Sequence, residues 1–249
     1  MNPYDFVRLD PNVTPPRRSA PRHDRFTGLS GRIEGTITTL TPLFIPSGPA
    51  GDGGVRQFRR NRYKKPILPG SSLKGLMRSI VETVGPGCWW LLAAEHQEKL
   101  PAAYRQCRDL NHLCPACRMF GMMQMGRNPQ MLEGHVRFND GVCDDPKPYP
   151  PMYPPLLSNP KPRHTAWYFA GHDGTVTGRK YFFPHAQVAS ESGLRTTRRN
   201  ETAQNIEIAP IGAGSVFTFS AAFDSVAEDD LALLLYALVL EDGVRHKIG

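Results

Sequence analysis

Apolar positions recur at helical spacing between Pro66 and Gly85. Six of them fall on one stripe of a helix: Leu73, Leu76, Met77, Ile80, Val81 and Val84. Ser71 or Ser72 can cap the first turn, and Gly85 followed by Pro86 can end the last one. The pattern therefore predicts an amphipathic helix that buries its apolar stripe.

Alternation of apolar and polar residues predicts strands elsewhere in the chain. Three stretches show it: residues 31–41, 134–140 and 215–223. An apolar helix is expected over 231–240, with Ser225 and Glu228 as a capping box. His135 and Asp140, at the two ends of the second strand, are expected to be structural rather than catalytic. Strands and helices in this mixed order favour an α+β fold.

Two aromatic segments, Trp167–Ala170 and Gly178–Pro184, flank a turn sequence and predict a β-hairpin. Arg179 and Lys180 stand beside Tyr181, which combines phosphate contacts with a stacking surface suited to single-stranded RNA. Packing in the core explains the aromatic residues equally well.

The charge balance of the 249 residues is basic, with 30 Lys and Arg against 23 Asp and Glu, a net charge of +7 and a pI of about 9.3. This favours an anionic partner. Residues 1–30 predict an extended basic arm, which is either solvated or docks on a neighbouring subunit or on RNA phosphates. The arm contains five prolines and a group of arginines at positions 17, 18, 22 and 25: Arg17, Arg18, Arg22 and Arg25. Residues 31–249 are expected to form a single domain.

A basic run without any acidic residue follows the first predicted strand. Its members are Arg56, Arg59, Arg60, Arg62, Lys64 and Lys65. Asp52 is the one carboxylate between that strand and the predicted helix. One carboxylate can hold a divalent metal, Mg²⁺ or Mn²⁺, or position a ribose 2′-hydroxyl while nearby cations stabilise the developing charge. The Gly-Asp-Gly sequence around Asp52 is also an ordinary turn.

The start of the predicted helix is a candidate anion site. Lys74 and Arg78 lie one turn apart, near free backbone N–H groups of the Ser71–Ser72 turn, and Gly70 would let a ligand approach the backbone. Exposed Lys and Arg on a solvated helix are the plain alternative. The phosphate loop of nucleotide hydrolases requires Gly-x-x-x-x-Gly-Lys-Ser/Thr, which is absent, so that class of enzyme is disfavoured.

Cysteine usage predicts a metal site. Cys114 and Cys117 form a Cys-x-x-Cys knuckle, the usual source of two zinc ligands, and Cys107 is the natural third. The fourth is Cys88, His112 or His96, in that order of preference. An odd total of five cysteines fits a reducing cytoplasm better than a disulfide framework. The sequence contains neither a run of 18 apolar residues nor an apolar signal core, so it indicates neither a membrane span nor secretion.

The sequence Ile67-Leu-Pro-Gly-Ser-Ser-Leu-Lys-Gly-Leu-Met-Arg78 resembles a signature of the RAMP superfamily, the RNA-binding proteins of CRISPR effector complexes. Cys114-Pro-Ala-Cys-Arg-Met-Phe-Gly121 resembles the second signature of that family. The resemblance extends from about Gly31 to Gly249. It is closest to backbone subunits of type III complexes, including the zinc-bearing repeats of single-protein type III effectors.

The resemblance implies a modified RRM-like, or ferredoxin-like, core with two insertions: a zinc-binding segment at about 86–125 and a thumb-like hairpin at about 145–212. Three arginines in the second insertion, Arg195, Arg198 and Arg199, would then contact RNA. Such subunits continue beyond the position of Gly249 into a final strand, so the chain is expected to be a fragment.

The implied function is binding of a CRISPR guide RNA as a backbone subunit, beside complementary target RNA and other effector subunits or copies of the chain itself. Asp52 occupies the loop in which resembling subunits carry an aspartate needed to cut target RNA. One alternative is a purely structural RNA-binding and assembly subunit. Another is an endoribonuclease that processes guide RNA, disfavoured because no histidine is placed as a base beside Lys74.

Overall fold

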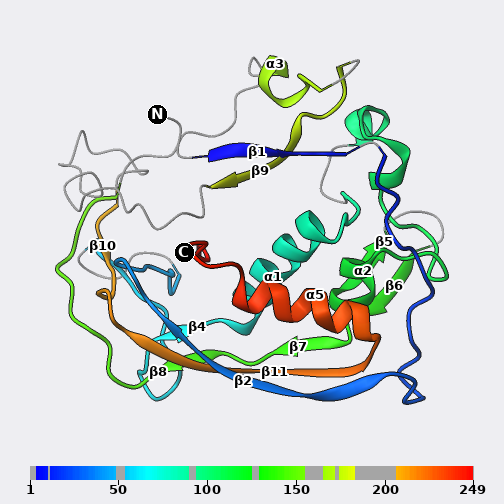
Figure 1. Cartoon of the computed structure of the whole chain (residues 1–249). Helices are drawn as coiled ribbons and strands as arrows, with labels where there is room; N and C mark the ends of the chain where they lie inside the picture. The colour runs from blue at the N-terminus through cyan, green and yellow to red at the C-terminus, as the bar shows by residue number, and fades with distance from the viewer. Residues whose placement is uncertain are drawn as a thin grey trace.

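A five-stranded sheet forms the base of the molecule in the computed structural model (Figure 1). Strand β11 (Val216–Val226) runs through its middle, antiparallel to β2 (Leu29–Thr38) on one side and to β7 (Val136–Phe138) and β8 (Gly141–Cys143) on the other. Strand β4 (Ile67–Leu68) pairs with β8. The structure describes residues 4–10, 12–48, 54–89, 94–124, 129–154, 165–171, 174–182 and 206–248.

Aromatic side chains of β11 fill the inner face of this sheet. Phe219 lies opposite Gly35, and Phe223 lies opposite Gly31. A Cβ at either glycine would come within 3.0 Å of the facing ring, so the glycines leave room for the phenyl groups. The predicted strands therefore form, and their apolar alternation marks the buried face.

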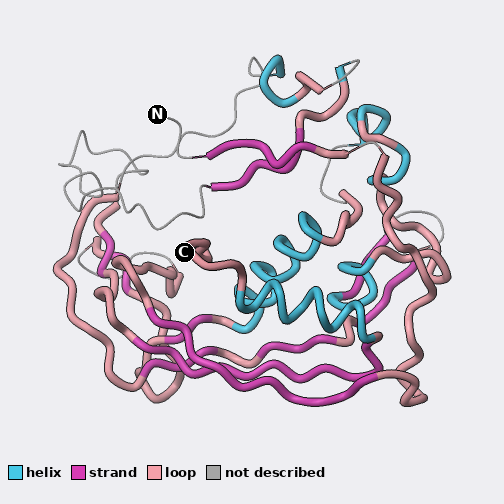
Figure 2. Tube along the Cα trace, viewed as in Figure 1, coloured by secondary structure: helices cyan, strands magenta, loops and turns pink. Residues whose placement is uncertain are grey.

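Helices α1 (Gly70–Val84) and α5 (Glu228–Val239) cover that inner face side by side (Figure 2). Leu73, Met77, Ile80 and Val81 are buried, as the apolar stripe predicts. Val84 is an exception: it is 46% exposed at the end of α1. The mixed helix and sheet architecture predicted from the sequence is confirmed, and the ferredoxin-like detail stays a prediction.

The remaining elements surround this core. Strand β1 (Tyr4–Arg8) pairs with β9 (Gly178–Phe182) in a ribbon on the far side of the helices from the sheet (Figure 1). Helix α2 (Pro115–Phe120) leads into the hairpin of β5 (Gly121–Gln124) and β6 (Gln130–Glu133). Short elements complete the described part: β3 (Arg56–Gln57), β10 (Ile208–Ala209), α3 (Thr165–Tyr168) and the 3₁₀ turns Ala94–Lys99 and Ala102–Tyr104.

Three local predictions are wrong. Residues 165–168 form helix α3, so β9 pairs with β1 instead of with an aromatic hairpin partner. No side chain caps α1, whose N-cap position is Pro69, so the expected caps Ser71 and Ser72 do not act as such. Helix α5 likewise begins after Ala227 without a side-chain cap, so Ser225 and Glu228 form no capping box.

The basic N-terminal segment is extended, as expected, but it lies along its own chain. Arg18 forms a bridge with Leu113, and the Ala20 N–H donates to the Leu110 carbonyl at 3.2 Å. The Pro16 carbonyl accepts a hydrogen bond from Arg118. Within the described ranges, each helix is too short or too polar to cross a membrane.

Candidate functional site

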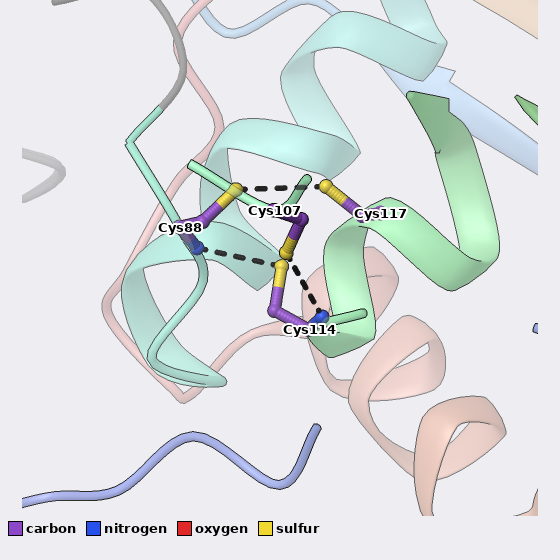
Figure 3. Close-up of side chains that lie close together, drawn as sticks. All are labelled: Cys88, Cys107, Cys114 and Cys117. Atoms are coloured by element: carbon purple, nitrogen blue, oxygen red, sulfur yellow. Dashed lines mark hydrogen bonds between the residues drawn. The ribbon is translucent and has the colours of Figure 1, made fainter. Parts of the chain in front are cut away.

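Four cysteines converge where the end of α1, the segment before α2 and α2 itself meet (Figure 3). Cys88 lies just beyond α1, Cys107 precedes α2, Cys114 is the N-cap of α2, and Cys117 lies within it. All four are buried and none forms a disulfide. The gathering of residues from three segments indicates a site built for a common ligand.

The spacing of the sulfur atoms fits a tetrahedral zinc ion. All four Sγ atoms lie within 4.8 Å of one another, and those of Cys88 and Cys117 are 3.5 Å apart. Zn–S bonds of about 2.3 Å in a tetrahedron place the sulfurs about 3.8 Å apart. A buried all-cysteine set leaves no coordination position for a substrate, so it suits a structural metal. Zn²⁺ bound there would tie the three segments together.

Hydrogen bonds to sulfur favour the thiolate form. The Cys88 N–H donates to Cys114 Sγ at 3.4 Å, and the Cys114 N–H donates to Cys107 Sγ at 3.3 Å. Hydrogen bonds from Cys107, Cys117 and Cys88 lower the pKa of the Cys114 thiol well below its ordinary value. The pKa of the Cys117 thiol is raised, mainly by its hydrogen bond with Cys107 and next by its hydrogen bond with Cys114. A cluster that ionises one member readily is prepared for a cation.

Two guanidinium groups approach the sulfur atoms from outside. Arg17 Nη1 lies 3.4 Å from Cys107 Sγ, and Arg78 Nη2 lies 3.7 Å from Cys117 Sγ. Among the three candidates for the fourth ligand, Cys88 belongs to the cluster, whereas His112 is exposed and lies outside it. His96, the other alternative, packs its ring edge-on against Phe169. The contacts of Arg17 and Arg78 with these sulfur atoms were not predicted from the sequence.

Arg78 and Arg179 are engaged inside the protein rather than presented to a ligand. Glu82 is buried and accepts hydrogen bonds from Arg78 Nε at 2.7 Å and from Arg179 Nη1 at 3.2 Å. Arg179 also donates to the carbonyls of Gly87 and Cys88, which holds the turn that carries the first cysteine. The i, i+4 spacing of Arg78 and Glu82 is a sequence signal for this ion pair. Lys180 is exposed on β9.

The start of α1 is closed by protein atoms. The Gly70 N–H donates to Asp140 Oδ1 at 2.8 Å. A Cβ at Gly70 would come within 2.2 Å of the Phe138 carbonyl oxygen. Gly70 therefore permits close packing against β7, and a carboxylate takes the place predicted for a bound anion. Asp140 has a structural role, as the sequence predicts.

Lys74 is the cation of α1 that stays available. It is half-buried, and it makes no ion pair or hydrogen bond within the described residues. Burial, followed by the charges of Arg78 and Arg137, lowers the pKa of Lys74, while Glu133 opposes this shift. An anion bound here would relieve the repulsion among three cations.

A tight turn between β3 and β4 carries most of the basic run. The Asn61 side chain accepts hydrogen bonds from the N–H groups of Tyr63 and Lys65, which holds residues 59–65 in a compact turn. Of its cations, only Lys65 forms an ion pair with an acid in the described residues, at 2.6 Å from Asp144. We refer to the exposed group Arg59, Arg60, Arg62 and Lys64 as the basic turn. Arg56 is half-buried beside it.

His23, His135 and Asp224 form a second group of ligand-type side chains within 4.8 Å. The two imidazole rings stack with centroids 4.0 Å apart and planes 6° from parallel. Ring nitrogens bind metals in the plane of the ring, and two stacked planes cannot both contain one ion. His135 instead has Asp224 Oδ1 at 2.8 Å and the Pro21 carbonyl at 3.1 Å, one at each nitrogen. The group fastens the N-terminal segment to the sheet.

Four predicted site residues lie outside the described ranges: Asp52, Arg195, Arg198 and Arg199. Their predicted roles in cleavage and in RNA contact stay predictions.

Comparison with known proteins places these features in a family. The model of the RAMP superfamily matches residues 36–242, which include α1, α5, all four clustered cysteines and every strand of the sheet except most of β2. No curated protein matches the chain.

Three solved structures are similar at low sequence identity. The chain is 16% identical, with a TM-score of 0.40, to a chain of the Type III-B Cmr-beta bound to cognate target RNA; the match covers 84% of this chain and 51% of that one. For Thermofilum pendens Csc2 the values are 12% and 0.38, with 87% and 63% covered. For a chain of a Type IV-B CRISPR complex they are 17% and 0.41, with 83% and 79% covered. The chain thus spans about half the length of the first of these.

Proposed function

Because the chain belongs to the RAMP superfamily, we propose that it is a guide-RNA-binding backbone subunit of a type III CRISPR effector complex. Its partners would be the guide RNA, the complementary target RNA, and other effector subunits or further copies of the chain. Such a subunit holds the backbone of the guide, since base pairing of the guide reads the target sequence.

The observation that carries this function is a set of cations that have no acidic partner among the described residues. Lys74 lies near the start of α1, and in the sequence only the short strand β4 separates this helix from the basic turn. Side chains of this kind bind phosphates without regard to base identity. Arg78 and Arg179 are left out of this set, because Glu82 and backbone carbonyls already hold them.

The metal centre would serve the RNA-binding helix indirectly. Zn²⁺ held by Cys88, Cys107, Cys114 and Cys117 would fix the end of α1 relative to α2. Arg78 reaches from the middle of α1 to Cys117, and its Nη1 also donates to the Gly121 carbonyl at 2.8 Å. A rigid α1 holds Lys74 in place at the surface.

Cleavage of bound target RNA by Asp52 with Mg²⁺ or Mn²⁺ is the added activity that we propose for the same subunit. The basis is the resemblance of its loop to that of cleaving subunits and the cations of the neighbouring basic turn. A non-catalytic subunit would bind RNA through the same groups. Arg195, Arg198 and Arg199 in the thumb-like insertion would extend the RNA contact.

Binding to labelled single-stranded RNA tests the proposed function directly. Fluorescence anisotropy with two oligonucleotides of unrelated sequence should give similar affinities at each salt concentration. The logarithm of the affinity should fall linearly with the logarithm of salt over about 50 to 200 mM. Absence of binding at low salt, or strong preference for one sequence, would contradict backbone binding.

A further inference from the structure

Arg17 connects the N-terminal segment to the metal centre. Its Nη1 lies 3.4 Å from Cys107 Sγ, and its Nη2 donates to the carbonyls of Ala103 at 2.9 Å and Arg105 at 2.8 Å. The three contacts bind one guanidinium to the segment that delivers Cys107. The contact spans 90 residues of sequence, so the chain must be folded for it to exist.

The same N-terminal segment, residues 12–28, is fastened at points on both sides of Arg17. We call it the strap. Arg118 donates to the Pro16 carbonyl at 2.8 Å and pairs with buried Asp230. Arg18 exchanges backbone hydrogen bonds with Leu113, at 3.0 and 2.8 Å, next to the knuckle cysteine Cys114. The strap therefore lies directly over the segment that supplies two of the four sulfurs.

The contact of Arg17 would depend on the metal, because the metal would fix the segment to which Arg17 is bonded. Four thiolates around one Zn²⁺ carry a net negative charge of two. Arg17 and Arg78 are the two cations with a nitrogen within hydrogen-bonding reach of the cluster sulfurs among the described residues. A guanidinium is a cation at any ordinary pH, and its hydrogen bond to an anionic sulfur is a strong one. Zn²⁺ would also fix the segment that carries Cys107, to which Arg17 is bonded through the carbonyls of Ala103 and Arg105, so loss of the metal would loosen the site that holds the strap.

We infer that the strap is a metal-dependent fastening: zinc in the cysteine cluster holds residues 12–28 on the core through Arg17, and the docked strap in turn retains the zinc. The reciprocity follows from linkage, because a contact that is stronger in the metal-bound state must also strengthen metal binding. The inference rests on the proposed metal centre. It assigns to Arg17 a positioning role that RNA binding does not require.

Limited trypsin digestion of the full-length protein reads the state of the strap, which offers cut sites after Arg18 and Arg25. Zinc-loaded protein should be cut there slowly, and protein stripped with a chelator should be cut at least about tenfold faster. Arg17→Gln should be cut fast in both states, because the coupling is gone. Arg22→Gln is the matched control: Arg22 is exposed and, within the described ranges, pairs only with the nearby Asp24, so this variant should behave as the parent.

Zinc release to a coloured chelator gives the reciprocal measurement. Arg17→Gln should lose zinc about tenfold faster than the parent and the Arg22→Gln control, as expected for a group that supports a metal ligand. Arg17→Lys keeps the charge but loses the forked geometry, so it should fall between the two. Hydrogen exchange at the Arg18 and Ala20 amides of the parent, with and without zinc, tests the coupling without any substitution.

The outcomes separate the two ideas. A protein that carries no zinc as purified would overturn the metal centre and the strap together. A zinc-loaded protein in which Arg17→Gln raises strap cleavage by the same factor with and without metal would overturn the strap alone, because Arg17 would then be an ordinary fastener. Unchanged zinc release in Arg17→Gln would do the same. RNA binding at Lys74 could survive either result.

Discussion

Arg78 points its guanidinium at buried Glu82, with Nε 2.7 Å from Oε1. The neighbouring cation on the same face of α1, Lys74, has no such partner in the described part of the chain. Two residues that share one sequence pattern therefore do different work. Arg78 joins α1 to the cysteine cluster, whereas Lys74 is left for an external anion.

One zinc per chain is expected, held by cysteine alone. Cys88→Ser should reduce the zinc content measured by elemental analysis to well below half an equivalent, because a structural site needs all four ligands. His112→Ala should leave the content unchanged, since His112 is exposed and outside the cluster. Zinc loss in the His112 variant, or full zinc in Cys88→Ser, would contradict the ligand set.

Two glycines of α1 should respond to alanine in opposite directions. Gly70→Ala should lower the free energy of unfolding by about 1–3 kcal/mol, because its Cβ would meet the Phe138 carbonyl at 2.2 Å. Gly75→Ala should raise it by about 0.5–1 kcal/mol, since that position is an exposed helix interior with open space around it. Urea denaturation measures both, and equal effects would contradict the described contact.

The periodic elements could be predicted from the sequence because their signals are local. The stripe of α1, the alternation in β11 and the cysteine knuckle each depend on neighbouring residues. The hydrogen bond from the Gly70 N–H to Asp140 at the start of α1 could not be predicted, because the two residues are 70 positions apart in the sequence. Arg179 and Glu82 are 97 residues apart, and nothing in either local sequence indicates their pairing. Long-range contacts leave no local pattern.

The aromatic hairpin failed for a related reason. Aromatic residues favour strands, but Thr177 binds the carbonyls of Trp167 and Tyr168, at 2.6 and 2.9 Å, and holds α3 beside the start of β9. The N-terminal segment supplies the partner strand instead. Tertiary contacts therefore outweigh the strand propensity of the aromatic residues at 167–169.

Acid should weaken the fastening at Asp224. Partial burial raises the pKa of the Asp224 carboxyl, but hydrogen bonds from His135 and Arg137 lower it by more, so the pKa lies below its ordinary value. Because the folded-state pKa lies below the unfolded value of about 3.9, the carboxylate stabilises the fold above about pH 4, and this contribution is lost as pH falls through the folded-state pKa. Asp224→Asn should lower stability near neutral pH and flatten the acid loss in denaturant titrations. An acid dependence identical to the parent would exclude this role.

Substitution of Asp52 should abolish cleavage of target RNA without weakening RNA binding. Asp52→Ala is expected to leave RNA affinity nearly unchanged and to abolish metal-dependent cleavage of complementary RNA by the assembled complex, because the other charged groups of the neighbouring run are cationic. Products of a labelled target are resolved on a gel. Regular cuts that persist in Asp52→Ala would remove Asp52 as the catalytic residue, and no cuts in either protein would favour the non-catalytic subunit.

The salt dependence of RNA binding in charge variants tests the central claim most directly. Lys74→Ala, and Arg59→Gln combined with Arg60→Gln, remove cations for which the described part of the chain supplies no acidic partner. Lys147→Gln is the control, because Lys147 is exposed and already paired with Asp145 at 2.6 Å. Each lost phosphate contact should reduce the slope of log affinity against log salt by about 0.7 for single-stranded RNA, equally for unrelated sequences. Slopes and affinities equal to those of the control, in folded protein with full zinc, would contradict RNA binding at this surface.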